Sequence, residues 1–386
     1  MKTTRTEEPH EEHLRFALAL DPELTGKGAS HVWSPYSVGA VLGLLATGAG
    51  GDTLRELAAL VAPASSDPVG HLDALNAAVE AADGLDLATL NGLYVPADLP
   101  LSTEFEERVG AQADAEVDRV DFRHNAEGVR AKVNDRVSQV TQGLIPELLS
   151  PGTVHPEVRL LLVNALWVKM LWAEPFEAAQ TRERDFHAPG GTHRVPTMRR
   201  TGRMTHAEHA GLRMVTLEGE HGLALDVIIP DSPGAERADA PPLTPEALRG
   251  LYRARRQEEV SLALPRFAVQ TDTALLEPLA ATPAHVRTLA TDSADFGGIS
   301  TEPIKVDAIV HQAVLRVDEK GAEGAAATAA VMVMSAVIPP KPKEFLVDQP
   351  FRFVLRRRGA ILFTGRITDP VDPGPAQTDR RGAPTA

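Results

Sequence analysis

A nearly continuous apolar run spans residues 160–169, Leu-Leu-Leu-Val-Asn-Ala-Leu-Trp-Val-Lys. A strand that is covered on both faces has this pattern, because neither side meets water. We therefore predict a central β-strand here. Asn164 lies inside it and should have a hydrogen-bond partner, since an unsatisfied buried amide costs about 1–3 kcal/mol. Residues 309–317 show apolar alternation, which predicts a second strand.

In the other apolar segments, the apolar residues recur either at the spacing of a helix or at that of a strand. Ser34 followed by Pro35 is an expected helix start, because serine caps the first N–H groups and proline fits the first turn. Helices are predicted at residues 13–20, 35–47, 54–60, 72–82, 103–113 and 128–142, and further strands at 87–95, 212–217, 223–229 and 260–264. The sequence thus predicts both helices and strands along the chain.

Between the strand at 309–317 and a proline-rich segment at 337–342 lies an alanine-rich tract, residues 318–336. Alanine favours helices, but this tract has no apolar stripe at helical spacing and contains two glycines. At a period of two, one face carries only uncharged residues, mostly small, and the single charge, Glu323, falls on the other face. The pattern is typical of a strand that can enter beneath a covering layer. The prolines that follow cannot join a central ladder.

Composition limits the classes of function. With 386 residues and 43% hydrophobic content, the chain can bury a sizeable core in one large or two medium domains. A net charge of −14 argues against nucleic acid as a partner, because phosphate binding needs a concentrated positive surface. The short arginine groups at residues 199–200, 253–256 and 356–358 are expected on solvated faces or strand edges.

The chain has no cysteine, which excludes disulfides, thiol catalysis and cysteine-ligated zinc. Residues 1–12 lack the apolar core of a signal peptide, and no run is long enough to span a membrane. We expect a cytoplasmic protein with no membrane partner, although export is left open. Arginine far outnumbers lysine, and alanine and glycine are abundant, which suggests a GC-rich, bacterial genome.

No catalytic or metal-binding pattern is found. A Gly-x-Ser-x-Gly elbow is absent, and no nucleophile can be paired with a base. Two histidine pairs, His10 with His13 and His206 with His209, are spaced three apart, which differs from the zinc-binding His-Glu-x-x-His spacing. We expect both pairs to face solvent. The predictions are therefore no catalytic residue, no metal, no cofactor and no enzyme activity.

Residues 319–328, Glu-Lys-Gly-Ala-Glu-Gly-Ala-Ala-Ala-Thr, resemble the hinge of the reactive-centre loop in serpins, the serine protease inhibitor family. Further resemblances follow in the family's order and cover about residues 12–370: Ser-Pro-x-Ser at 34–37, Gly-Ala-x-Gly-x-Thr at 48–53, the block at 160–176, and Asp-Gln-Pro-Phe at 348–351 with residues 361–370. Ser30 and Met170 depart from the family pattern, where asparagine and glycine are usual.

The resemblance implies the α+β class and a metastable serpin fold with three β-sheets, eight to nine helices and an exposed reactive-centre loop at about residues 319–342. It implies a single domain at residues 1–370, followed by a polar, disordered tail at 371–386. The hinge residues are then Glu319, Gly321, Ala322, Glu323, Gly324, Ala325, Ala326, Ala327 and Thr328. Gly324 replaces the usual alanine.

By the same resemblance, Ser34, Ser37, Asn164 and His311 form the shutter, a polar cluster beneath the place where the main sheet opens. Trp172 belongs to the breach at the top of the sheet, where the loop first enters. Three of the site residues also have a purely structural interpretation. In that interpretation His311 is a core histidine with its hydrogen bonds satisfied, Trp172 is a core residue, and Glu319 is a surface charge. For Glu319 the resemblance implies a salt bridge that holds the loop outside.

The reactive bond follows Ser335 by the family's usual interval, or Met334 if the hinge is one residue shorter; the flanking residues are Met334, Ser335 and Ala336. Neither position has a basic residue before the bond, so an elastase-, subtilisin- or chymotrypsin-like target is expected over a trypsin-like one. The implied activity is suicide inhibition of a serine protease through a covalent acyl complex, by a monomer. The alternative is a non-inhibitory serpin that binds ligands or acts like a chaperone.

Overall fold

The computed structural model describes residues 7–24, 28–112, 115–231, 243–322 and 341–374. Over these ranges the chain forms eight α-helices and two hydrogen-bonded β-sheets, which confirms the α+β class. The helices are α1 (Glu11–Leu20), α2 (Pro35–Gly48), α3 (Gly51–Val61), α4 (Pro68–Asn76), α5 (Thr103–Gly110), α6 (Phe122–Val140), α7 (Pro245–Ala254) and α8 (Leu276–Ala281). Helix α2 begins as predicted, because the Ser34 hydroxyl accepts a hydrogen bond from the Ser37 N–H.

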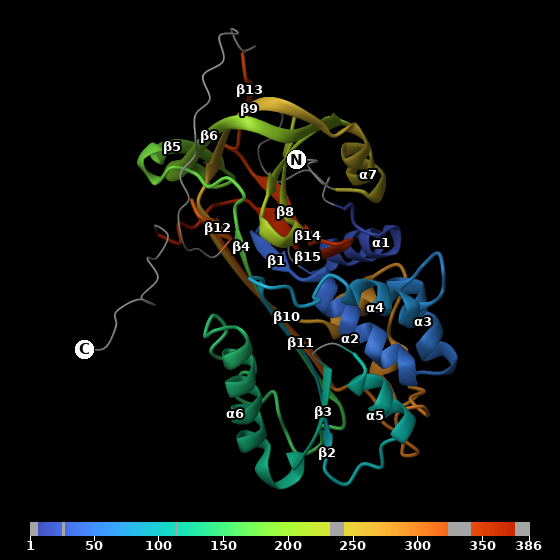
Figure 1. The fold of residues 1–386 in the computed structure, drawn as a ribbon. Helices are drawn as coiled ribbons and strands as arrows, with labels where there is room; N and C mark the ends of the chain where they lie inside the picture. Colours follow the sequence, from blue (N-terminus) through green and yellow to red (C-terminus); the bar gives the residue numbers. More distant parts are fainter. Residues whose placement is uncertain (1–6, 25–27, 113–114, 232–242, 323–340, 375–386) are drawn as a thin grey trace, which may run out of the picture.

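A six-stranded sheet runs from the middle of the molecule to the end that carries α5 and α6 (Figure 1). Its strands, in spatial order, are β10 (Phe267–Ala274), β11 (Ala308–Val317), β12 (Gly321–Ala322), β4 (Leu161–Leu171), β2 (Asp86–Pro96) and β3 (Ala115–Val120). The apolar run at residues 160–169 thus forms a central strand, as its pattern predicts. Every residue from Leu161 to Leu166 is buried.

The second sheet has nine strands. In order they are β1 (His31–Trp33), β15 (Ala360–Ile367), β14 (Phe351–Arg357), β8 (Leu223–Pro230), β7 (Leu212–Glu218), β6 (Gly191–His209), β9 (Arg256–Pro265) and β13 (Lys343–Leu346), with β5 (Arg182–Ala188) also on β6. The family resemblance implied three sheets. Strand β6 pairs first with β5, then with β9, and finally with β7. Because β6 pairs with all three of these strands, two of the three expected sheets form one continuous hydrogen-bonded sheet.

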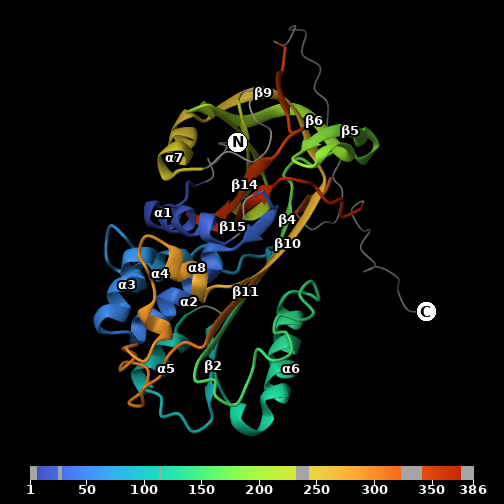
Figure 2. The same cartoon turned by 180° about the vertical axis from the view of Figure 1, so that it is seen from behind.

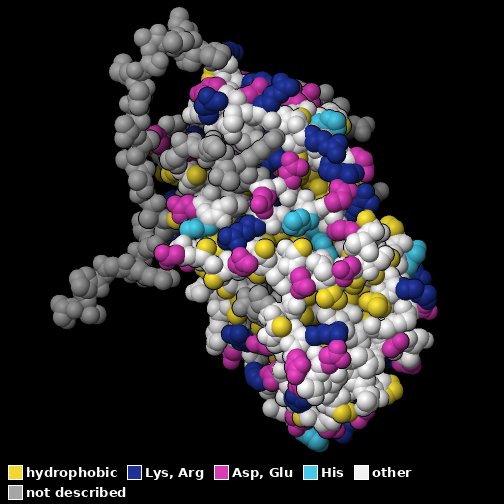
Figure 3. All heavy atoms as spheres, turned by 45° about the vertical axis from the view of Figure 1, so that its right-hand side comes forward, with side chains coloured by type: hydrophobic (Ala, Val, Ile, Leu, Met, Phe, Trp, Pro, Cys, Tyr) yellow, Lys and Arg dark blue, Asp and Glu magenta, His cyan; other side chains and the backbone are white. Residues whose placement is uncertain are grey.

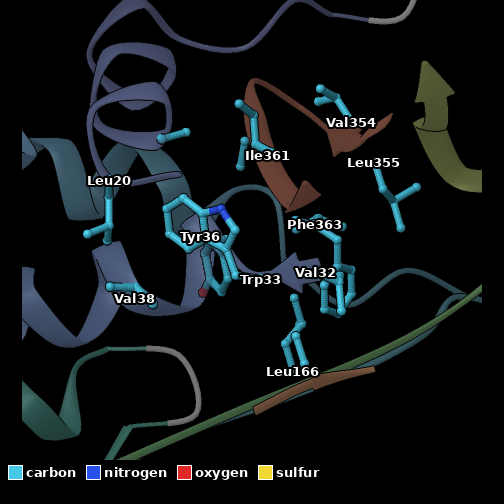
Figure 4. Packing of buried hydrophobic residues seen from close by; sticks show 14 of the residues in the cluster. Leu20, Val32, Trp33, Tyr36, Val38, Leu166, Val354, Leu355, Ile361 and Phe363 are labelled. Carbon is cyan, nitrogen blue, oxygen red and sulfur yellow. The ribbon is translucent and has the colours of Figure 1, made fainter. Parts of the chain in front are cut away.

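Two cores fill the space around β4. One face of this strand packs with the nine-stranded sheet and the helices from α1 to α5, and Figure 4 shows Leu166 of β4 beside Val32 of β1. The other face carries Leu161 and Val163 and packs against α6, which stands apart on its own side of the sheet (Figure 2). Even-numbered and odd-numbered positions of β4 thus belong to different cores.

Two sequence-based expectations about histidine were wrong. His13 is fully buried, because α1 turns its ring inward beside Phe16 and within 5.5 Å of the His71 ring. His206 is also buried, on the inner face of β6, with its Nδ1 atom 2.9 Å from Glu258 Oε2. Only His10 and His209, the other members of the two pairs, are exposed.

The arginine groups contain both exposed and buried side chains. Arg199, Arg253 and Arg256 are exposed, as predicted. Arg255, Arg356 and Arg357 are buried, against the prediction. The Arg356 Nε–H donates to Asp226 Oδ2 at 2.6 Å, and the Arg255 and Arg357 side chains donate to backbone carbonyls. Elsewhere, charges of both signs are interspersed on the face shown in Figure 3.

The segment after β15 begins with defined contacts, so the predicted start of the disordered tail at residue 371 is too early. The carbonyl of Val371 accepts a hydrogen bond from the Ala268 N–H at 2.7 Å. The Asp372 carboxylate accepts one from Arg266 Nη2 at 3.0 Å. Residues 375–386 lie outside the described part of the chain.

Candidate functional site

Strands β4 and β11 are paired at one end and separated over most of their length. They pair in parallel through residues 161–164 and 308–311, ending with His311 opposite Asn164. Above this point no direct pairing joins them in the described structure. A pocket lies there instead, lined by residues of both strands and of the turn after α6: Leu166, Trp167, Val168, Val314, Leu315, Arg316, Thr141, Leu144 and Ile145. The two central strands are therefore not hydrogen-bonded to each other above His311 and Asn164, and a small pocket lies between them and this turn.

The hinge enters this space at the top. Strand β12 lies between β4 and β11 and is antiparallel to both, with Gly321 opposite Leu171 and Ala322 opposite Met170 and Val317. A Cβ atom on Gly321 would lie 1.9 Å from the Met170 carbonyl oxygen, so only glycine fits. Gly321 and Ala322 of the hinge thus already occupy the position of an added strand.

A tight turn leads from β11 into the hinge. The Asp318 carboxylate accepts hydrogen bonds from the backbone N–H groups of Lys320, at 2.8 Å, and Gly321, at 3.2 Å. Burial raises the pKa of this carboxyl, although the two N–H groups lower it in part. The turn reverses the chain within three residues and aims the hinge down between the strands.

Glu319 anchors the base of the hinge. Its carboxylate accepts a hydrogen bond from the Thr181 hydroxyl at 2.7 Å and lies 3.5 Å from Arg266 Nη1. Its carbonyl accepts a further bond from the Phe176 N–H at 2.8 Å. The side chain is only 4% exposed. The interpretation as a surface charge was wrong, and the salt bridge implied by the family resemblance is present.

Trp172 closes the top of the space. Its indole Nε1–H donates to the Asp318 carbonyl at 2.9 Å, and its backbone N–H donates to the Lys320 carbonyl at 3.0 Å. The ring packs edge-on against Phe176, with the ring centres 6.3 Å apart. Trp172 is therefore a core residue that also holds the hinge turn.

The four predicted shutter residues come together, all buried, where β4 and β11 pair. The Ser34 N–H donates to His311 Nε2 at 3.0 Å, and the Ser34 hydroxyl caps α2 at Ser37. Burial lowers the pKa of His311 to about 4, so the ring is neutral at pH 7. Because Nε2 accepts a hydrogen bond, the ring proton is on Nδ1.

Asn164 finds its partner in Asn91 of β2, with Nδ2 to Oδ1 at 2.5 Å. Among the described residues, the Ser37 hydroxyl, Asn164 Oδ1 and His311 Nδ1 have no hydrogen-bond partner.

The structure also adds residues that the sequence did not single out. Asn91 pairs with Asn164, and its polar position within the apolar strand at 87–95 was the available signal. Thr181 and Arg266 contact Glu319, but nothing in the sequence around either residue indicated this contact. The remaining hinge residues, 323–328, and the reactive-bond residues Met334, Ser335 and Ala336 lie outside the described part of the chain.

No group of three or more histidine, aspartate or glutamate side chains in the described residues is arranged to hold a metal ion. No helix in the same ranges is long and apolar enough to cross a membrane.

A family model described as "Serpin (serine protease inhibitor)" matches residues 11–370. The chain belongs to the serpin family. It is 29% identical to Serpin-Z1C of Triticum aestivum over 93% of this chain and 94% of that protein. It is 31% identical to a serpin-like protein of Thermococcus kodakarensis over 92% of this chain and 84% of that protein. Among solved structures, thyroxine-binding globulin in complex with thyroxine has a TM-score of 0.81 at 21% identity, over 94% of this chain and 99% of that chain.

Proposed function

We propose that this serpin inhibits a serine protease as a suicide substrate, by inserting its reactive-centre loop between β4 and β11. Serpin loop insertion is a known case of strand addition that releases stored strain. The observation that carries the proposal for this chain is the divided strand pair: β12 already occupies the top of the space, and the strands below it are unpaired.

The register of β12 determines at which hinge residue insertion reaches the paired part of β4 and β11. Ala322 lies opposite Met170, and each further hinge residue would lie opposite the preceding residue of β4. Residues 323–327 would then face 169–165, which are unpaired with β11, and Thr328 would reach Asn164. Insertion thus begins where β4 and β11 are not paired with each other. Beyond Thr328 the Asn164–His311 pairing must open.

The chemical step uses the protease's own machinery. The protease serine oxygen attacks the carbonyl carbon of Met334 or Ser335, the C–N bond to the next residue breaks, and the released amine takes the proton. An ester then links the loop to the protease, and water would normally hydrolyse it. The freed hinge inserts before that happens and carries the protease along.

The energy of insertion is ample for trapping. About a dozen new backbone hydrogen bonds at about 1 kcal/mol each give on the order of 10 kcal/mol. Slowing ester hydrolysis a hundredfold needs only about 3 kcal/mol. A displacement of about 1 Å in the protease active site can itself cost about a hundredfold. Distortion of the trapped protease therefore stops the reaction at the ester.

The target class follows from the residues before the bond. Met334 and Ser335 are uncharged and unbranched, which suits elastase-, subtilisin- or chymotrypsin-like proteases and not trypsin-like ones. The hinge has no proline, bulky or second charged residue at 321–328, in keeping with an inhibitor. We further propose that the protein acts as a monomer with no enzyme activity, cofactor or membrane partner. A bacterial source and a cytoplasmic location remain the expectations.

The second candidate function is ligand binding without inhibition. It is favoured by one observation, the similarity in fold to thyroxine-binding globulin, whose structure contains thyroxine. At 21% identity this similarity concerns the fold alone.

Mixing the protein with chymotrypsin or subtilisin separates the two candidates. The inhibitor forms a covalent complex that survives SDS, with loss of protease activity. Cleavage of the loop without such a complex, by every protease of the three classes, would favour the binding protein.

A further inference from the structure

Strand β6 separates from its neighbour β7 partway along its length, and a pocket lies at this fork. The β6–β7 ladder begins with Thr205 opposite Thr216, and between this pair and β5 the only described strand bonded to β6 is β9. Opposite β6, the Ala173 N–H donates to the Glu218 carbonyl at 2.9 Å and joins the end of β7 to the segment after β4. The pocket is therefore closed at one end by paired strands and along one side by this joined segment.

Arg200 of β6 also lines the pocket and is a buried cation with few partners. Its side chain is only 14% exposed. Its Nη1–H donates to the Glu174 carbonyl, and the guanidinium carbon lies 5.6 Å from the centre of the Phe176 ring. Among the described residues, its Nε atom has no hydrogen-bond partner. A guanidinium group has five N–H donors and no acceptor, so most of the hydrogen-bonding capacity of Arg200 is unused within the described structure.

The charge of Arg200 is also poorly balanced. Its one described ion-pair partner, Glu174 Oε2, lies 3.9 Å away on a side chain that is 69% exposed, so water weakens the attraction. Burial lowers the pKa of Arg200, and Glu174 reverses this shift only in part. A buried cation is stabilised when an anion with matching acceptors lies beside it. Arg200 therefore favours an anion in the pocket.

The other charged side chains limit which anion fits. Arg203 and Glu218 line the pocket as well, and neither forms an ion pair within the described residues. Together with Arg200 and Glu174 they give the lining two positive and two negative charges. A phosphate monoester, with a charge of about −1.5 to −2 at pH 7, would lose more hydration than a carboxylate and gain little from a lining without net charge. A single carboxylate is therefore the better match.

The pocket is larger than a bare anion. Its volume is about 460 Å³, within the range of about 300–1,000 Å³ that is usual for small-molecule sites. Ala173 and the buried Met204 give it an apolar wall. Thr205 and Gln257, whose side chains are hydrogen-bonded to each other at 2.7 Å, give it a polar one. An organic carboxylate with a short apolar body matches both walls.

We infer that this pocket binds a small organic monocarboxylate, with the carboxylate group on Arg200 and the apolar body against Met204. Binding does not require the proposed inhibition, because none of the lining residues belongs to the reactive-centre loop. The site nevertheless lies close to the hinge. The Phe176 ring is next to Arg200, and the Phe176 N–H donates to the Glu319 carbonyl.

Calorimetric titration of the full-length protein tests the site with three probes of similar size: phenylacetate, phenyl phosphate and phenylethanol. Phenylacetate should bind with a dissociation constant on the order of 1 mM. The uncharged phenylethanol should bind about tenfold more weakly or worse, because only a carboxylate can accept from the open donors of Arg200. Equal binding of these two probes, or no binding of phenylacetate at about 10 mM, would overturn the inference. Tighter binding of phenyl phosphate than of phenylacetate would overturn the choice of a carboxylate.

Variants show whether binding occurs in this pocket. Arg200→Met should weaken phenylacetate binding by about tenfold or more. The matched control, Arg199→Met, removes the same charge from an exposed neighbouring residue outside the pocket and should leave binding unchanged. Glu218→Gln should strengthen binding by about 2-fold to 5-fold, since it removes a repulsive charge.

A further variant keeps the test valid if Arg200→Met does not fold. Ala173 is exposed and lines the pocket, so Ala173→Phe fills the space without changing the core, and it should abolish binding. Unchanged phenylacetate binding in Arg200→Met or in Ala173→Phe would overturn the inference. So would a loss in Arg199→Met as large as that in Arg200→Met.

Discussion

The Nε2 atom of His311 accepts a hydrogen bond from the Ser34 N–H at 3.0 Å, across 277 residues of sequence. This bond ties β11 to the start of α2 at the level where β4 and β11 first pair. It requires a neutral ring, since a protonated Nε2 can only donate. Protonation of His311 therefore breaks a hydrogen bond at the level of the sheet that must open when the loop inserts.

The first prediction concerns pH. Burial lowers the pKa values of His311 and His71 to about 4 and of His13 to about 3, from 6.5. The folded state keeps these rings neutral while the unfolded chain takes up protons below pH 6.5, so stability falls as pH falls from about 6.5 to about 4. The slope is about 1.4 kcal/mol per pH unit for each histidine. Denaturant unfolding at pH 7.5 and 5.5 should differ by up to about 4 kcal/mol.

His311→Gln is the control for this effect. Its amide oxygen can accept the Ser34 N–H bond but does not titrate, so about a third of the pH-dependent loss should disappear. The same loss in the variant as in the wild type would contradict the assignment.

The second prediction concerns Asn91. Asn91→Leu removes the acceptor of the Asn164 amide, which stays buried. The free energy of unfolding should fall by about 1–3 kcal/mol, the cost of an unsatisfied buried group. Urea titration measures it. A change below about 0.5 kcal/mol would mean that Asn164 has another partner.

The third prediction concerns Gly321. In Gly321→Val the side chain meets the Met170 carbonyl, so the hinge cannot take the β12 position. Proteases should still cut the loop, but covalent complexes should fall at least tenfold on SDS gels. Gly324→Ala is the matched control: it restores the family's usual residue, reduces chain freedom, and should trap at least as well as the wild type. Equal trapping by both variants would exclude entry through β12.

The fourth prediction locates the reactive bond. Arginine placed directly before the cut bond should convert the protein into a trypsin inhibitor, because trypsin-like pockets select a basic residue. Met334→Arg and Ser335→Arg are therefore compared with trypsin, and mass spectrometry identifies the new chain ends. Conversion by Ser335→Arg alone supports the family's usual interval, and conversion by Met334→Arg alone supports the shorter hinge. A cut outside residues 334–336 would contradict both.

Local patterns predicted the parts of this structure that depend on local physics. The continuous apolar run at 160–169 had to be covered on both faces and became β4, and Ser34 capped α2 as its side chain dictates. The shutter residues were found only through the family resemblance, since Ser34 and His311 are far apart in sequence. Nothing local says that they meet.

The incorrect predictions also concern contacts between residues that are far apart in the sequence. Arg356 is buried because Asp226, 130 residues earlier, supplies its counter-charge. His13 and His206 were expected at the surface from their spacing, but helix phase and strand phase turned both inward. The pairing of Glu319 with Arg266 and Thr181 likewise joins separate strands and loops. Such contacts follow from the fold and not from the neighbouring residues.

The central claim is that the intact chain stores energy that is released when the cut loop joins the sheet. The thermal midpoints of the intact protein and of the protein cleaved in the loop test it most directly. On the order of 10 kcal/mol, with an unfolding entropy near 2.1 cal/mol/K per residue, predicts a rise of about 10 °C or more after cleavage. A cleaved protein that melts at or below the midpoint of the intact one would contradict the account.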